Sequence, residues 1–138
     1  MDYLLISNSP KYWGFIRTLR NNPKVRPGFV QQDHISPGQQ MKYMEKYNDN
    51  YFVCLYDGEP VGFIGEIDDD IRLAVCPACQ RRGIGSFMLW EFMKLRPNSV
   101  PKVLKTNTVS QKFFEKCGFV LESEDELFYY YKITFINE

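Results

Sequence analysis

The sequence has little histidine, few cysteines, no net charge and no long apolar run, and each shortage excludes a class of protein. No apolar segment approaches the ~20 residues that a membrane-spanning helix needs. The formal net charge of +0 argues against a general nucleic-acid binder, because such proteins carry an excess of lysine and arginine. Residues 1–4 do not begin a basic segment followed by a long apolar stretch, so we expect no signal peptide and a cytoplasmic location.

The four cysteines and one histidine are too few for a common structural zinc site. Such a site usually takes four ligands from two C-x-x-C-like pairs, whereas Cys76 and Cys79 form one pair and Cys54 and Cys117 stand alone. We therefore expect no metal. A thioredoxin-like dithiol at Cys76 and Cys79 is one interpretation, and small apolar spacers are the other. The spacers are favoured, because the Gln-Arg-Arg-Gly-Ile-Gly run that follows has no role in a dithiol site.

What the sequence does contain is enough apolar material for one domain over residues 1–138. Its 138 residues are 44% hydrophobic and 16% aromatic, which suffices for a sizeable core. Periodicity, caps and turn residues predict the order β-α-α-β-β-β-α-β-α-β-β, a mixed sheet with helices on its faces. The predicted strands are 3–6, 51–56, 61–67, 71–76, 103–106, 119–121 and 127–135. The predicted helices begin at Pro10, after Ser36 with a Ser36–Gln39 capping box, at Gly85, and at Asn107 or Thr108 with a Thr108–Gln111 box.

One stretch near the middle of the chain has the pattern of a strand, a turn and a helix. Leu73–Val75 is apolar, Pro77 ends the strand, and helical spacing of apolar residues begins after Gly85. Two arginines and two glycines lie between strand and helix, at positions 81–85. Because a helix start has unpaired N–H groups and a partial positive charge, this turn is suited to a phosphate or pyrophosphate. Residues 78–116 add to this charge with eight Lys/Arg against two Glu.

Two motifs carry a resemblance to a known family. Val75–Gly85 has the form V-x-P-x-x-Q/R-x-x-G-x-G/A, and Asn107–Phe119 matches N-x-x-A-x-x-F-Y-E-K-x-G-F. Together they resemble the GCN5-related N-acetyltransferase (GNAT) family over about residues 50–121. The resemblance implies a mixed, mostly antiparallel sheet of six to seven strands flanked by about four helices. It also implies an N-acetyltransferase that uses acetyl-CoA as co-substrate, with direct attack in a ternary complex.

The resemblance further implies which residues bind acetyl-CoA. The strand would pair with the pantetheine arm, the amides of the turn would hold the diphosphate, and the second motif would contact the pantetheine or phosphate. A bulge in the strand would leave one N–H free for the thioester oxygen. The implied residues are Leu73, Ala74, Val75, Gln80, Arg81, Arg82, Gly83, Ile84, Gly85, Ser86, Asn107, Ser110 and Phe114.

The chain departs from the family pattern at two positions. Ser110 replaces the usual alanine, which is a small change. Phe114 stands where a tyrosine often protonates the leaving thiolate, and phenylalanine has no proton to donate. Either another tyrosine or a water molecule protonates the leaving thiolate, or the thiolate leaves without a proton donor. A catalytically idle acetyl-CoA-binding module is therefore an alternative.

An amine acceptor must be neutral before it attacks, so a general base is expected. The carboxylates nearest the reaction strand are Asp70, then Asp69 and Glu66, and we rank them in that order. The alternative is that Asp68–Asp70 is only a solvated turn, since aspartate favours turns.

The acceptor is expected to be the primary amine of a small molecule, bound between the first two helices and the late strands. The run 19–26 and His34 faintly resemble GNAT enzymes that acetylate nucleotide-linked amino sugars. Arg20, Arg26 and His34 could therefore contact an acidic or sugar acceptor. We expect no nucleic acid or membrane as partner, and a monomer or homodimer.

Overall fold

The computed structural model describes residues 3–26, 33–80 and 82–133, which form seven strands and four α-helices in the predicted order. The strands are β1 (Tyr3–Ser7), β2 (Tyr51–Tyr56), β3 (Glu59–Ile67), β4 (Asp70–Val75), β5 (Lys102–Leu104), β6 (Phe119–Glu124) and β7 (Phe128–Ile133). The helices are α1 (Pro10–Asn21), α2 (Pro37–Tyr47), α3 (Ile84–Leu95) and α4 (Thr108–Lys116), with short 3-10 turns η2 (Asn48–Asn50) and η3 (Pro77–Cys79). None of the helices in this part of the chain combines the length and the apolar character that a membrane crossing requires.

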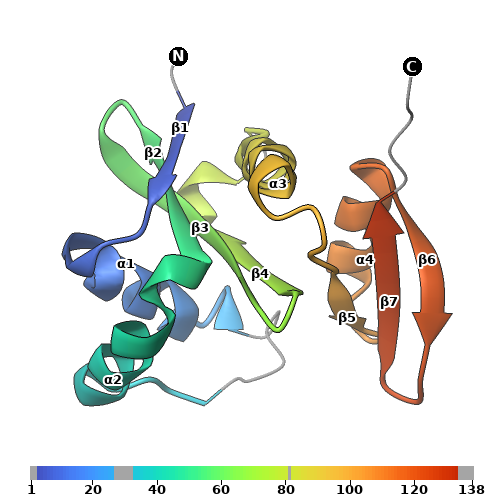
Figure 1. Ribbon diagram of the computed structural model, residues 1–138, viewed down its shortest axis with the longest axis horizontal. Helices are drawn as coiled ribbons and strands as arrows, with labels where there is room; N and C mark the ends of the chain where they lie inside the picture. The colour runs from blue at the N-terminus through green and yellow to red at the C-terminus, as the bar shows by residue number, and fades with distance from the viewer. Residues whose placement is uncertain (1–2, 27–32, 81, 134–138) are drawn as a thin grey trace.

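The strands form two antiparallel sheets rather than one continuous sheet. The first has the order β1-β2-β3-β4 and the second the order β5-β7-β6 (Figure 1). They meet at a parallel bridge between Asp70 and Val100, where the Ile71 N–H donates to the Val100 carbonyl over 2.9 Å. The predicted fold class is confirmed, with the sheet divided between β4 and β5.

Helices cover both faces of the first sheet (Figure 1). On one face, Ile16 of α1 and Met44 of α2 are buried against Phe63 of β3. On the other face, Met88 and Phe92 of α3 are buried with strand residues and with part of α4. Alternate residues of each strand therefore face different helices, as the two-residue period of a strand requires.

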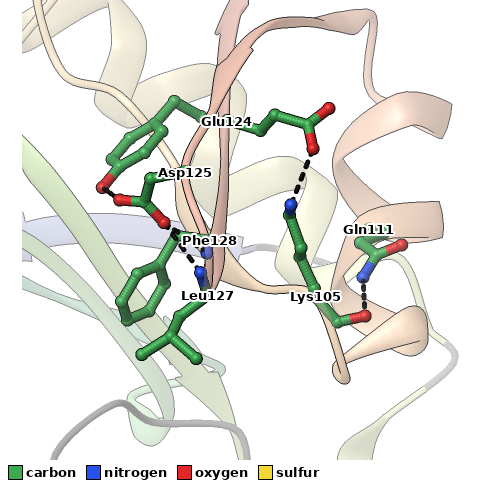
Figure 2. Close-up of polar contacts among 7 residues, drawn as sticks. Lys105, Gln111, Glu124, Asp125, Leu127 and Phe128 are labelled. Carbon is green, nitrogen blue, oxygen red and sulfur yellow. Dashed lines mark hydrogen bonds and ion pairs between the residues drawn. The ribbon is translucent and has the colours of Figure 1, made fainter.

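The caps of α2 and α4 show one correct prediction and one wrong one. The Ser36–Gln39 capping box is present, with both reciprocal hydrogen bonds. The Thr108–Gln111 box is wrong, because Asn107 caps α4 by accepting the Ser110 N–H over 3.1 Å. The Gln111 side chain instead donates to the Leu104 and Lys105 carbonyls, at 3.2 and 2.9 Å. This ties α4 to the end of β5; Figure 2 shows the contact with Lys105.

The hairpin between β6 and β7 is held by its own acidic side chains. Asp125 accepts the N–H groups of Leu127 and Phe128 at 2.9 and 2.8 Å, and the Tyr130 hydroxyl donates to its other oxygen over 2.6 Å. Glu124 pairs with Lys105 across 2.6 Å (Figure 2). The predicted last strand ends at Ile133, and its remaining residues lie outside the described part of the chain.

We predict that Gly65→Ala destabilises the fold, because a Cβ at Gly65 would lie 2.5 Å from the Tyr51 ring and 2.6 Å from the Asn50 carbonyl oxygen. Such overpacking should lower the free energy of unfolding by about 1–3 kcal/mol, measured by urea denaturation. Gly14→Ala is the matched control. A Cβ there meets nothing within 4 Å and lies in a helix, so stability should rise by about 0.5–1 kcal/mol. Equal midpoints for Gly65→Ala and the unmodified protein would contradict the packing described.

Candidate functional site

The edge of β4 that faces away from β3 carries unpaired backbone groups. The Cys76 N–H donates to Val61 of β3, whereas the Ile71 N–H donates to Val100 on the opposite side. Because backbone groups alternate along a strand, the N–H groups of Leu73 and Val75 point to the same side as that of Ile71. Within the described residues no strand pairs with β4 there beyond the bridge at Asp70. This edge can accept an extended ligand with amide groups.

The bulge expected in β4 is absent. The pairing of β3 with β4 is regular from Gly62–Val75 to Ile67–Asp70. The register shifts lie elsewhere, between β2 and β3 in the first sheet and between β6 and β7 in the second. The free N–H groups of β4 arise instead because, within the described residues, this edge has only the bridge from Asp70 to Val100, in the segment before β5. Ala74, assigned to the ligand by sequence, turns its backbone to β3 and buries its side chain with Ile16 and Met44.

The turn after β4 presents a second set of free N–H groups. Gly83 is the N-cap of α3 and has a φ of 77°, a left-handed conformation that glycine adopts without strain. The first hydrogen bond of α3 is from the Phe87 N–H to the Gly83 carbonyl. No acceptor from the described residues meets the N–H groups of 82–86. These groups and the helix dipole favour an anion.

The other sequence-assigned residues of this turn have structural contacts. The exposed Gln80 side chain donates to the Val75 carbonyl over 3.3 Å and so joins the end of β4 to the turn. A Cβ on Gly85 would lie 3.1 Å from the Phe113 ring, so glycine here lets α4 pack against α3. The Ile84 side chain is buried, and Ser86 lies 3.5 Å from the Cys117 sulfur. Arg82 is exposed, and Arg81 lies outside the described residues.

Of the three residues assigned to the ligand in the second motif, two lie at the start of α4 and one lies in the core. Asn107 and Ser110 form the N-terminal turn of α4, where the Asn107 oxygen is occupied by the Ser110 N–H. The Phe114 ring is 6% exposed and packs against Phe119 and Tyr131. Phe114 therefore belongs to the core of the described chain.

A cavity of about 580 Å³ adjoins the end of β4. One wall is Cys76, Pro77 and Ala78, and the other is Asn22, Pro23 and Lys24 from the segment after α1. Lys24 is exposed and is the one charged residue among the described residues that line this cavity. The sequence analysis did not assign Lys24 to the ligand, because only tertiary packing brings it beside the end of β4.

The three candidate bases have different surroundings. Asp69 is exposed in a tight turn with a φ of 68°, as expected for a solvated turn residue. The Glu66 carboxylate accepts the Asp69 N–H and the Asn50 side-chain N–H, both at 3.1 Å. Glu66 therefore holds the turn, and the geometry favours Asp70 over both.

Asp70 is the first residue of β4 and faces the side of the sheet that α1 and α2 cover. Its neighbour Ile71 packs on the α3 side, which leaves Asp70 and Arg72 on the other. One carboxylate oxygen lies 3.9 Å from the Arg72 guanidinium. The other is buried and has no hydrogen-bond partner within the described part of the chain. Burial raises the pKa of Asp70, and the positive charges of Arg72 and Lys102 oppose that rise.

The three residues expected to contact the acceptor lie in α1, in the turn after α1, and before α2. Arg20 of α1 is buried, and burial lowers its pKa; Tyr51, Tyr43 and Arg72 are close enough to influence its charge. Arg26 lies in the turn after α1, and His34 is exposed before α2. The interaction with Arg72 links Arg20 to β4, and Arg72 is a residue that sequence reasoning did not single out.

The Cys76–Cys79 pair lacks the electrostatics of a redox site. Burial raises the pKa of the Cys76 thiol, with a smaller contribution from Cys79, whereas reactive dithiols have a lowered pKa. The geometry therefore does not favour the thioredoxin-like alternative. Among the described residues, no three His, Cys, Asp or Glu side chains gather closely enough to hold a metal ion.

Solved structures share this fold at low sequence identity. PaiA N-acetyltransferase from Thermoplasma acidophilum, in complex with coenzyme A, is 18% identical with a TM-score of 0.68, covering 97% of this chain and 100% of that one. Spermidine N-acetyltransferase from Vibrio cholerae, with CoA and spermine, is 17% identical with a TM-score of 0.76 and 94% coverage of both chains. AAC(6')-Ib, with paromomycin and acetyl-CoA, is 13% identical with a TM-score of 0.76, covering 96% and 94%.

A comparison with curated protein sequences gives no significant match. A family model, however, described as an acetyltransferase (GNAT) domain, matches residues 47–121. That range includes β4, the turn, α3 and α4, which are the elements that carry the free N–H groups and the two motifs. Because this model matches more than half of the chain, the protein belongs to the GNAT acetyltransferase family.

Proposed function

We propose that residues 1–138 act as one acetyltransferase domain that moves an acetyl group from acetyl-CoA to the primary amine of a small acceptor. The observation that carries this proposal is the continuity of two unpaired backbone surfaces, the open edge of β4 and the N-terminus of α3. Family membership supports the reaction class, and the coenzyme A bound to structures of the same fold supports the choice of acetyl donor.

The backbone of this chain would hold the donor along its whole length. The N–H groups of Leu73 and Val75 would pair with the pantetheine amides, as an added strand pairs with a sheet edge. The N–H groups of 83–86 would bind the diphosphate, and Arg82 and Lys24 would add positive charge. Asn107 and Ser110 lie at the start of α4, where the Asn107 side-chain amide can still donate a hydrogen bond.

The reaction joins the amine nitrogen to the acetyl carbon and breaks the bond between that carbon and the CoA sulfur. The Leu73 N–H would donate to the carbonyl oxygen as it gains negative charge. Asp70, whose side chain is 25% exposed, would take a proton from the amine. Because a free thiol has a pKa of about 8.5, the CoA sulfur can leave as a thiolate without a tyrosine at position 114 to protonate it.

We predict that Gly83→Glu weakens acetyl-CoA binding at least tenfold, about 1.4 kcal/mol, because a carboxylate beside the free N–H groups repels the diphosphate. Isothermal titration calorimetry measures this. Gly83→Asn is the matched control, since asparagine tolerates the left-handed conformation and adds no charge, and it should retain binding within about threefold. If both variants bind acetyl-CoA like the unmodified protein, the diphosphate lies elsewhere.

We predict that Asp70→Asn lowers kcat about 100-fold or more, because the amide cannot accept the amine proton. In the unmodified protein, kcat should rise as the pH passes upward through the raised pKa of Asp70, since only the carboxylate is a base. That acidic limb should disappear in the variant. Asp68→Asn changes an exposed turn residue and should leave the pH profile as it was. An unaltered profile in Asp70→Asn would exclude Asp70 as the base.

We also predict that Asp70→Asn stabilises the fold at pH 7. A carboxyl whose pKa is raised on folding opposes folding wherever it is ionised in the unfolded chain. The gain should be full above the raised pKa and should vanish as the pH falls below the ordinary value of 3.8. Thermal denaturation of both proteins between pH 3 and pH 8 measures it. A lower midpoint for the variant at pH 7 would show that Asp70 stabilises the fold.

A further inference from the structure

Arg72 and Asp70 lie side by side on the face of β4 that α1 and α2 cover. They are two residues apart on one strand, and their charged groups approach to 3.9 Å, the outer limit of an ion pair. Both side chains remain partly accessible, at 30% and 25% exposure. A base and a guanidinium are therefore available together at one place, next to the open edge at Leu73.

The surroundings of this pair are rich in positive charge. Arg20 of α1 lies close enough for the charge of Arg72 to contribute to lowering its pKa, after the larger effect of burial. The positive charge of Lys102 also acts on Asp70 and opposes the rise of its pKa. Asp70 is thus close to cations from β4 and β5. A negatively charged group of a ligand would be attracted by the charge of Arg72.

Three acidic side chains of the β6–β7 hairpin have partners close to the hairpin. Glu124 pairs with Lys105 and Asp125 accepts hydrogen bonds from its own hairpin (Figure 2), and Glu122 pairs with Lys132 across 3.5 Å. A polyamine would need free carboxylates spaced along its length. The carboxylates of Glu122, Glu124 and Asp125 are therefore already engaged and are not free for a polycationic acceptor.

We propose that the acceptor is a free amino acid, whose amine meets Asp70 while its carboxylate is bound by Arg72. An amino acid carries both groups on one carbon, so they can meet two side chains that lie only 3.9 Å apart. When the amino acid binds, the long ion pair between Asp70 and Arg72 is replaced by two ion pairs. Asp70 pairs with the amine and Arg72 with the carboxylate, each through a charge-assisted hydrogen bond. This inference rests on the proposed acetyl transfer and names its acceptor class.

The first test is a panel of acceptors with acetyl-CoA, followed through release of the CoA thiol. Each of the twenty amino acids is compared with its own amide, which keeps the amine and removes the negative charge. Spermidine, glucosamine and glucosamine 6-phosphate complete the panel. We expect at least one amino acid to have a kcat/KM at least tenfold above that of its amide. A preference for an amide, the polyamine or either sugar would overturn the inference.

The second test is Arg72→Gln, assayed with the preferred amino acid and its amide. The variant should raise KM for the amino acid at least tenfold and bring its kcat/KM to the level of the amide. Arg72→Lys keeps the charge and should recover part of the difference. Lys94→Gln removes a charge from a side chain that is 71% exposed on α3, and should retain the full preference. An undiminished preference in Arg72→Gln would exclude Arg72 as the carboxylate site.

Failure of this inference is distinct from failure of the proposed function. Turnover of amides or polyamines alone would overturn the amino acid acceptor and leave the acetyltransferase intact. Absence of acetyl-CoA binding by calorimetry, in protein shown to be folded by circular dichroism, would overturn the proposed function itself.

Discussion

The parallel bridge between β4 and the segment before β5 is the constraint on which the candidate site depends. The Ile71 N–H donates to Val100, and the Val100 N–H donates to Asp69 over 2.6 Å. Beyond this point no strand among the described residues pairs with that edge of β4, so its backbone groups lack a strand partner. Such groups need a hydrogen-bond partner when they are removed from water. The proposed binding of acetyl-CoA depends on this division of the sheet, because it leaves those backbone groups without a strand partner.

The open edge of β4 has a charged or polar group at each end, the N-terminus of α3 at one and Asp70 at the other. α3 begins directly beyond the end of β4, and its first turn adds free N–H groups where the strand stops. Gly85 allows Phe113 of α4 to pack closely against that turn, which supports it from the core side. At the other end of β4, Asp70 lies near the charges of Arg72 and Lys102 and faces α1 and α2. An acetyl donor and an amine acceptor would therefore approach β4 from opposite ends.

The buried oxygen of Asp70 has an energetic cost in the described chain, since a partly buried carboxylate lacks a full set of hydrogen bonds. Neighbouring cations reduce that cost without removing it, because the Arg72 guanidinium stays at 3.9 Å. Buried carboxylates with a shifted pKa are common at functional sites, where a base must be ready to take a proton. Glu66, whose two oxygens are both occupied, shows the contrasting structural use of a carboxylate in the same turn.

The sequence by itself determined the order of the elements, the turn at 82–86 and the family resemblance, because periodicity, caps and glycine spacing are local properties of the chain. Only the tertiary structure decided that the sheet divides after Asp70, that no bulge is needed, and that Asn107 rather than Thr108 caps α4. It also brought Arg20 and Arg72 together. These features depend on contacts between residues far apart in the sequence, and no local pattern records which strand edge stays unpaired or which charges become neighbours.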